Sequence, residues 1–331
     1  MAVIGSILHG AYGDYYEQAV ALRYYKYRNP SDRVILFFAT QSRLNELSVL
    51  DFSFADGIYL ADALVDVMVD RFVQFNVFDR ELNQDILSKL PESVLRKMDL
   101  KNNIISWQVV REVWKKKPDL CDIPLSQSGR ERLPLCMAEN GVDGTTFTDN
   151  YTVGFLWRPR AVIGSSRSVL LPRLFEKMGA PKDSLLETKS EVFDFFARKQ
   201  GALVIIAGMG VKTTAENSER TDCKYSEQKL DIPAERSVYL KGLNWALELE
   251  IMRRCDFCLM MPSGFTEVLW LKRGGRVQLL DCPPMYLAKV LWNRMPFFGL
   301  ASPRELFFQL RQPHTLDRTL RHLRGILPLR K

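Results

Sequence analysis

The sequence predicts an α/β protein made of two doubly wound, Rossmann-like halves that face a central cleft. The chain has 331 residues, of which 47% are hydrophobic, enough for two domains with ordinary cores. Short apolar runs alternate with stretches of helical periodicity, a pattern typical of parallel strands joined by helices. We expect domains at residues 1–145 and 146–300, followed by a basic helical tail at 301–331.

The first half contains a βαβαβ pattern. Apolar runs predict the strands, and apolar residues at helical spacing predict the helices between them. In chain order the elements are Val3–Leu8, Tyr15–Tyr27, Arg33–Ala39, Ser42–Leu50 and Gly57–Leu60. The stretch Leu82–Trp114 is expected to be mostly helical.

The second half repeats this architecture after a polar stretch. Periodicity is lost over Asp122–Asn150, which predicts a linker or a long surface loop. The expected strands are Tyr151–Trp157, Ala202–Ala207, Ser237–Leu240, Asp256–Met261 and Arg276–Leu280. The expected helices are Arg167–Met178, Lys189–Lys199, Leu243–Arg254 and Ser263–Arg273, and Lys212–Arg236 is expected to be a mobile surface loop.

Charge is concentrated in the tail. The net charge is +7, and residues 303–331 carry seven basic and two acidic side chains. Because most of the excess charge therefore lies in the tail, the rest of the chain is close to neutral, and nucleic acid is not an expected partner. Leucines at helical spacing, with arginines between them, predict an amphipathic basic helix. Either this helix docks on the body with a solvated basic face, or it contacts an anionic membrane or acceptor. The leucines of this predicted helix are Leu316, Leu320, Leu323 and Leu327, and its arginines are Arg318, Arg321 and Arg324.

Composition also indicates the cell compartment and whether a histidine-bound metal ion is expected. The six scattered cysteines indicate reduced thiols, and the N-terminal sequence lacks the features of a signal peptide, so a cytoplasmic location is expected. Of the three histidines, His314 and His322 lie in the tail and are expected to face solvent. A multi-histidine metal site is therefore not expected.

The first candidate site is the turn after the first strand, where ligands of parallel sheets usually bind. It contains His9, Gly10, Tyr12, Gly13 and Asp14. Its glycines allow a tight turn but do not fit the dinucleotide fingerprint. Asp14 could be a catalytic base or only the N-cap of the following helix, and His9 is a candidate for substrate contact.

The second candidate site is the start of the helix at residue 263. Free backbone N–H groups, the Ser263 hydroxyl and the helix dipole at Gly264 would suit a diphosphate. Glu267, one turn farther on, could accept the hydroxyls of a ribose. The alternative is that Ser263 only caps the helix, with Glu267 in a capping-box-like role.

Two further pairs follow strands of the second half. Arg158 and Arg160 could neutralise a leaving diphosphate in place of a metal ion, or could belong to a solvated turn. Gly208 and Gly210 would let a base or ribose approach the backbone. The sequence has no Walker A motif, no His-Glu-x-x-His and no Asp-x-Asp, so neither a metal nor a cofactor is expected.

These residues resemble the GT-B glycosyltransferases, particularly the heptosyltransferase-like and fucosyltransferase-like inverting enzymes. Gly10 to Asp14 with the following helix looks like their N-terminal acceptor motif, and Leu243 to Lys272 looks like their donor-binding half. The resemblance implies that Asp14 acts as base and that a nucleotide-sugar donor binds the C-terminal half. Phe265 and Thr266 depart from the family pattern, and residues 281–298 match no donor motif, so the donor stays open.

The function expected from the resemblance is transfer of a sugar from a nucleotide-diphosphate donor to a carbohydrate or glycoconjugate hydroxyl. A nucleotide-sugar 2-epimerase of the same architecture remains an alternative. So does a non-catalytic protein that binds a nucleotide or a glycan.

Overall fold

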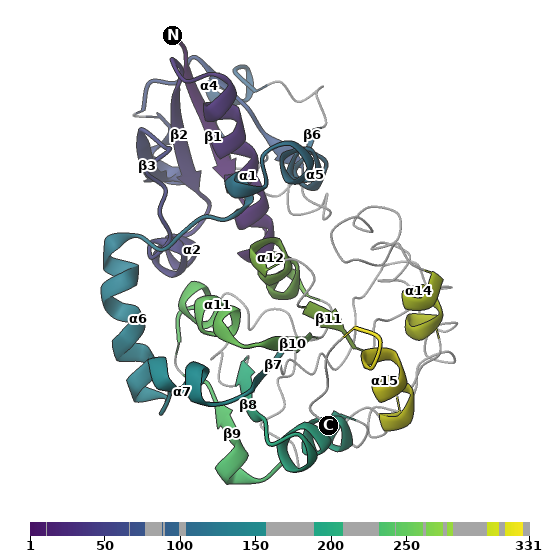
Figure 1. Ribbon diagram of the computed structural model, residues 1–331. Coiled ribbons are helices and arrows are strands. Elements are labelled where there is room, and N and C mark those ends of the chain that lie inside the picture. The colour runs from purple at the N-terminus through teal and green to yellow at the C-terminus, as the bar shows by residue number, and fades with distance from the viewer. Residues whose placement is uncertain are drawn as a thin grey trace. The chain divides into compact units, whose positions relative to one another are not determined.

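The computed structural model describes residues 1–10, 12–65, 67–76, 88, 90–98, 104–156, 189–207, 232–241, 243–260, 263–273, 277–280, 303–310 and 315–326. By contacts the chain divides into two compact units (Figure 1). Unit 1 is formed by Met1–Leu135, Asn244–Leu249 and Ser263–Gly274. Unit 2 is formed by Cys136–Leu243, Glu250–Pro262 and Gly275–Lys331.

Unit 1 is built on a parallel four-stranded sheet in the order β3-β2-β1-β4. The strands are β1 (Val3–Leu8), β2 (Arg33–Phe38), β3 (Gly57–Leu60) and β4 (Arg71–Phe72). The first three match the predicted strands. Two further short strands, β5 (Phe75–Asn76) and β6 (Ile104–Ile105), pair separately and were not expected.

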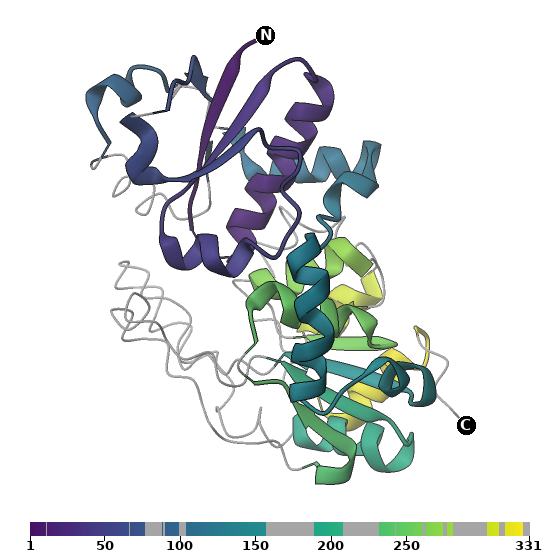
Figure 2. The same cartoon turned by 90° about the vertical axis from the view of Figure 1, so that its left-hand side faces the viewer.

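Helix α1 (Tyr12–Arg28) covers one face of this sheet and packs against α5 (Ser106–Lys116) (Figures 1 and 2). Ala19 and Val20 of α1 and Val113 of α5 are fully buried, and the Ser106 hydroxyl of α5 donates to the buried Glu17 carboxylate of α1 at 3.2 Å. The shorter helical segments of unit 1 are α2 (Gln41–Leu47), η1 (Ala61–Val65), α4 (Glu92–Leu95) and η2 (Pro118–Cys121). Within the expected helical stretch Leu82–Trp114, the described residues therefore contain two helices and a short strand.

Unit 2 is built on a parallel five-stranded sheet in the order β11-β10-β7-β8-β9. Its strands are β7 (Thr152–Leu156), β8 (Leu203–Ala207), β9 (Ser237–Tyr239), β10 (Phe257–Met260) and β11 (Val277–Leu279), all at predicted positions. Strands such as β7 and β10 are buried along their whole length, as expected for a parallel sheet covered on both faces. The expected α/β fold with two parallel sheets is confirmed.

The helices of the second half are also at expected places. They are the helix at 189–199, which ends in a π-helical turn (Phe195–Lys199), α11 (Trp245–Arg254) and α12 (Gly264–Arg273). Although α12 and the first part of α11 follow unit 2 strands in sequence, their contacts place them in unit 1. The expected helix Arg167–Met178 lies outside the described residues. So does most of Lys212–Arg236, whose end forms η4 (Ala234–Arg236).

The alternative of a long surface loop over Asp122–Asn150 is wrong, whereas a boundary between the two units, at Leu135 and Cys136, does fall within this stretch. This stretch contains α6 (Gln127–Glu139) and α7 (Gly144–Asp149). Its polar residues act as helix caps: Asp143 forms a capping box with Thr146, and the Ser126 hydroxyl accepts a hydrogen bond from the Gly129 N–H at 3.2 Å. Because caps and turns use the same residue types, the composition suggested a loop.

The tail folds into α14 (Pro303–Leu310) and α15 (Leu316–Leu323), both part of unit 2. The prediction that His322 faces solvent is wrong, because its ring is buried and stacks on Phe308 with centroids 4.0 Å apart. His314 lies outside the described residues. Among the described helices none combines the length and apolar character needed to cross a bilayer.

Candidate functional site

The turn after β1 is shaped by Gly10, whose φ of +97° favours glycine. Helix α1 begins at Tyr12, so Asp14 lies inside the first helical turn. The interpretation of Asp14 as the N-cap of a helix starting at Tyr15 is therefore wrong. A carboxylate inside the first turn still interacts favourably with the helix dipole.

The Asp14 carboxylate folds back over Gly10. A Cβ added at Gly10 would lie 2.8 Å from Asp14 Oδ2, so a side chain there would displace the carboxylate. The Gln18 side chain, one helical turn after Asp14, stabilises this loop. Its Nε2 donates to the backbone carbonyl oxygen of His9 at 2.8 Å and to the backbone carbonyl oxygen of Asp14 at 2.9 Å. The backbone on both sides of the turn is thus fixed by one buried amide.

His9 is buried beside this turn and is 2% exposed. Its Nε2 lies 3.1 Å from the carbonyl oxygen of Phe75, so Nε2 carries the proton and donates. The other ring nitrogen, Nδ1, has no hydrogen-bond partner among the described residues. Burial lowers the pKa of His9, while the bond to Phe75 and the charge of Asp14 oppose that effect. His9 is therefore a neutral ring with an acceptor nitrogen.

The start of α12 is capped by Ser263. The Ser263 Oγ accepts a hydrogen bond from the Thr266 N–H at 3.2 Å and lies 3.1 Å from the Thr266 hydroxyl. Thr266, not Glu267, occupies the reciprocal capping position, so the capping-box-like role considered for Glu267 is wrong. Glu267 lies one residue farther along the helix and is partly exposed.

The turn and the start of α12 meet through two glycines. A Cβ added at Gly13 would lie 2.8 Å from the Gly264 Cα and 3.0 Å from its carbonyl oxygen. A Cβ at Gly264 would lie 3.2 Å from the Gly13 Cα. The approach requires glycine at position 13, whereas a side chain at position 264 would need the neighbouring backbone to shift by a few tenths of an ångström. Residues separated by some 250 positions in sequence are thereby joined within unit 1.

A column of stacked side chains supports this contact, and of its members only Tyr12 belongs to a predicted site motif. The Arg43 guanidinium lies 3.8 Å from the centroid of the Tyr12 ring, and Tyr12 stacks on Trp245 at 5.5 Å. Trp245 in turn meets the edge of Phe265 at 5.8 Å. The backbone N–H of Trp245, at the start of α11, donates to the Glu46 carboxylate at 2.9 Å. Burial raises the pKa of Tyr12, while Arg43 opposes the shift.

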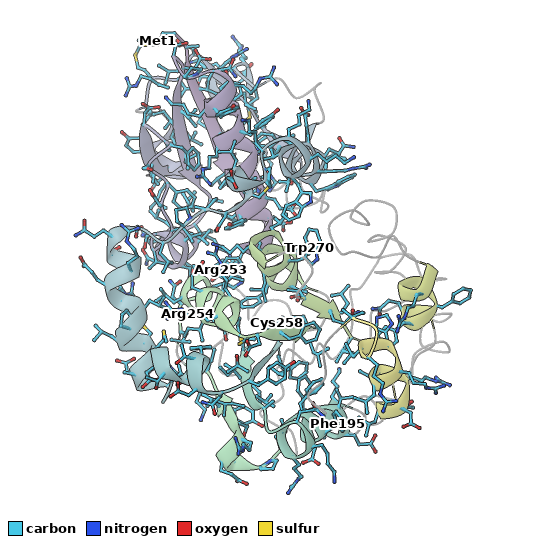
Figure 3. All side chains as sticks on the ribbon, in the orientation of Figure 1. Met1, Phe195, Arg253, Arg254, Cys258 and Trp270 are labelled. Carbon is cyan, nitrogen blue, oxygen red and sulfur yellow. The ribbon has the colours of Figure 1, made fainter. Side chains whose placement is uncertain are left out.

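The far end of α12 is held by a buried lysine. The Lys272 side chain is 0% exposed, and its Nζ lies 2.7 Å from Asp122 Oδ1 and 2.8 Å from the Ile123 carbonyl oxygen. Trp270, on the same helix (Figure 3), contacts Trp114 of α5 with ring centroids 4.8 Å apart. Both ends of α12 are therefore fixed to the N-terminal half of the chain.

Some of the expected site residues lie outside the described residues, namely Arg158, Arg160, Gly208 and Gly210. Those that the structure brings together are Gly13 and Gly264, with Tyr12, Asp14 and Ser263 adjacent to them in sequence. Within the described part of the chain, no group of three or more His, Cys, Asp or Glu residues is arranged to hold a metal ion.

The chemistry of this arrangement follows from two helix starts at one place. The first N–H groups of a helix have no acceptor in their own helix, and the dipole adds partial positive charge. Two such ends, from helices of 17 and 10 residues, favour an anion such as a diphosphate. The Asp14 carboxylate in the first turn of α1 is a group that can accept a proton.

Comparison with known proteins gives no match to a family model, and a search of curated proteins finds no match either. Solved structures do match. A glycosyl transferase family 9 protein from Veillonella parvula has a TM-score of 0.54 and 11% identity, over 98% of this chain and 97% of that one. The E. coli ADP-heptose LPS heptosyltransferase II has a TM-score of 0.54 and 13% identity, over 98% of each chain. At such identities the similarity is one of fold: the chain shares the two Rossmann-like domains of these GT-B glycosyltransferases.

Proposed function

We propose that this protein is a glycosyltransferase that moves a sugar from a nucleotide-diphosphate donor to a hydroxyl of a carbohydrate or glycoconjugate acceptor. The observation that carries the proposal is the backbone contact between Gly13 and Gly264. It joins the turn with the Asp14 carboxylate to the start of α12, where an anion is favoured. The solved structures that share the fold are named as glycosyltransferases, which supports the same reaction class.

In this proposal the donor diphosphate binds at the start of α12. Gly13 covers one side of Gly264, so the phosphates would use the remaining side of the helix end, beside Ser263. Glu267, one turn along, would accept hydrogen bonds from the ribose hydroxyls. Arg158 and Arg160 would stabilise the departing diphosphate, and Gly208 and Gly210 would let the base or ribose approach the backbone.

The reaction is a single displacement with inversion. The acceptor oxygen attacks the anomeric carbon while Asp14 takes the hydroxyl proton. The bond between the anomeric carbon and the donor phosphate oxygen breaks, and its electron pair leaves with the nucleotide diphosphate. Helix dipoles and arginines balance the developing charge, so the proposal requires no metal ion and no further cofactor.

The first experiment identifies the nucleotide of the donor. Thermal-shift measurements with UDP, GDP, ADP and CMP show which nucleotide stabilises the protein, and ADP is tested first because one neighbour is named for ADP-heptose. Release of nucleotide diphosphate is then measured with matching nucleotide sugars and a panel of glycan acceptors, in buffer containing EDTA. Release that requires acceptor and survives EDTA supports the proposal. Nucleotide binding without acceptor-dependent release would leave the binding protein or the epimerase as the better interpretation.

The base is tested by Asp14→Asn. Because the amide cannot take a proton, we expect the catalytic rate to fall by roughly 10² to 10⁴-fold with little change in nucleotide affinity. Glu92→Gln is the control, since it also removes a first-turn carboxylate of a unit 1 helix but lies in α4. Turnover of Asp14→Asn close to that of wild type would show that Asp14 is not the base.

A further inference from the structure

Helices α14 and α15 are attached to unit 2 through one buried face. Phe308 and Leu323 belong to the hydrophobic core of that unit, and Leu320 is also buried. The His322 ring, stacked on Phe308, lies 3.3 Å from the Gln278 side-chain oxygen. The leucine side of the predicted amphipathic helix is therefore used for internal packing.

The opposite face of α15 is basic. Arg318, Arg321 and Arg324 follow one another at three-residue spacing, which puts them on neighbouring positions of one helix side, and all three are exposed. Asp317 is an exposed acid on that side. Among the described residues, no carboxylate is within ion-pairing distance of Arg321 or Arg324; the Arg321 Nε donates to the Asp317 carbonyl oxygen instead.

Two exposed apolar side chains lie on α14 and just after the end of α15. Phe307 is 60% exposed and Ile326, two residues after Arg324, is 42% exposed. Phe307 lies one helical turn after Arg304 on α14, and Arg304 Nη2 donates to the carbonyl oxygens of Arg321 and His322 at 3.1 and 2.9 Å. This contact brings the exposed side of α14 to the C-terminal end of α15, and Figure 1 shows the two helices next to each other.

Gly325 lies directly against the Arg304 guanidinium. A Cβ at Gly325 would overlap the Arg304 guanidinium, so a side chain there would displace the end of this flexible arginine. The positive charge of Arg304 is also favourable at a helix C-terminus. The exposed surface formed by Phe307, Arg318, Arg321, Arg324 and Ile326 is called the basic corner below.

We propose that the basic corner docks the protein on an anionic lipid bilayer. A basic helix lying in the interface places its arginines among the lipid phosphates while apolar side chains enter the boundary of the acyl region. Phe307 and Ile326 supply that apolar contribution. They favour a bilayer over duplex nucleic acid, because non-specific binding to a duplex rests essentially on phosphate contacts. This inference does not depend on the proposed sugar transfer.

The test uses the full chain and vesicles of phosphatidylcholine, alone or mixed with phosphatidylglycerol. We expect co-sedimentation with the mixed vesicles only, and release by high salt. Each arginine near an anionic surface contributes about fivefold to binding, so Arg318→Gln, Arg321→Gln and Arg324→Gln together should weaken it by on the order of a hundredfold. Phe307→Ser should weaken binding further without changing its salt dependence.

The matched control removes three exposed charges elsewhere, with Arg33→Gln, Lys115→Gln and Arg132→Gln in unit 1. This variant should bind vesicles like wild type. Thermal melts check folding, and Arg324→Gln alone, with an expected loss of about fivefold, serves if the triple variant does not fold. Equal binding to both vesicle types, equal losses in the two triple variants, or retention on an oligonucleotide column without vesicle binding would each overturn the proposal.

Discussion

The contact between Gly13 and Gly264 predicts a specific response to one added methyl group. In Gly13→Ala the new Cβ would lie 2.8 Å from the Gly264 Cα, and the atom it meets is backbone that cannot rotate away. Overpacking of this kind costs about 1 to 3 kcal/mol. Alanine in a helix recovers at most about 1 kcal/mol relative to glycine. We therefore expect a net loss of up to about 2 kcal/mol in the free energy of unfolding.

Two other glycines provide controls for this estimate. Gly264→Ala places its Cβ 3.2 Å from the Gly13 Cα, a contact that a small backbone shift relieves, so it should be much milder. Gly144 is the first residue of α7, and a Cβ there meets nothing within 4 Å. Gly144→Ala should be neutral or slightly stabilising, because it gains helix propensity without a clash.

Thermal unfolding measures the difference. For a unit of this size a change of 1 kcal/mol shifts the melting temperature by about 2 to 4 °C, so Gly13→Ala should melt visibly lower than both controls. A Gly13→Ala protein that melts as high as the Gly144→Ala protein would refute the close approach of the two helix starts.

Three further predictions follow from the surroundings of the site. Ser263→Ala with Glu267→Ala should weaken nucleotide binding by about 1 to 3 kcal/mol in calorimetry, and an unchanged affinity would contradict the donor assignment. In urea unfolding, Asp122→Asn should cost about 1 to 3 kcal/mol and more than Lys272→Met, because it leaves the buried ammonium without a carboxylate; equal costs would argue against this ion pair. Burial holds the folded pKa of His9 below its unfolded value of about 6.5, so stability is complete above that pH and falls as the pH drops through the folded pKa. Between neutral and mildly acidic pH, the melting temperature of His9→Gln should therefore fall less steeply than that of wild type. An equally steep fall would show that other groups cause the pH dependence.

The parallel strands could be predicted from sequence because their signal is local. In β2 the residues Val34 to Phe38 are all apolar and all buried, which happens only when both faces of a strand are covered. Strands of two residues, such as β4, have no periodicity to detect. The helices of residues 127–149 were missed because their caps have the composition of loops.

The candidate site could be predicted only as separate pieces. The glycine turn and the Ser263 helix start each have a recognisable local pattern, whereas Arg43, Glu46 and Trp245 belong to no motif. The start of Trp245's helix is capped by Glu46 from 199 residues away, and Lys272 reaches Asp122 across 150 residues. No local pattern encodes such pairs.

The sequence by itself determined which segments form buried strands and which strand ends carry glycines, because burial and tight turns restrict the residue types at each position. The tertiary structure decided that Gly13 meets Gly264, that Asp14 lies inside a helical turn and that His322 is buried. These outcomes depend on how whole helices pack against one another. Packing is a property of surfaces assembled from distant parts of the chain, so it leaves no mark in any single stretch of sequence.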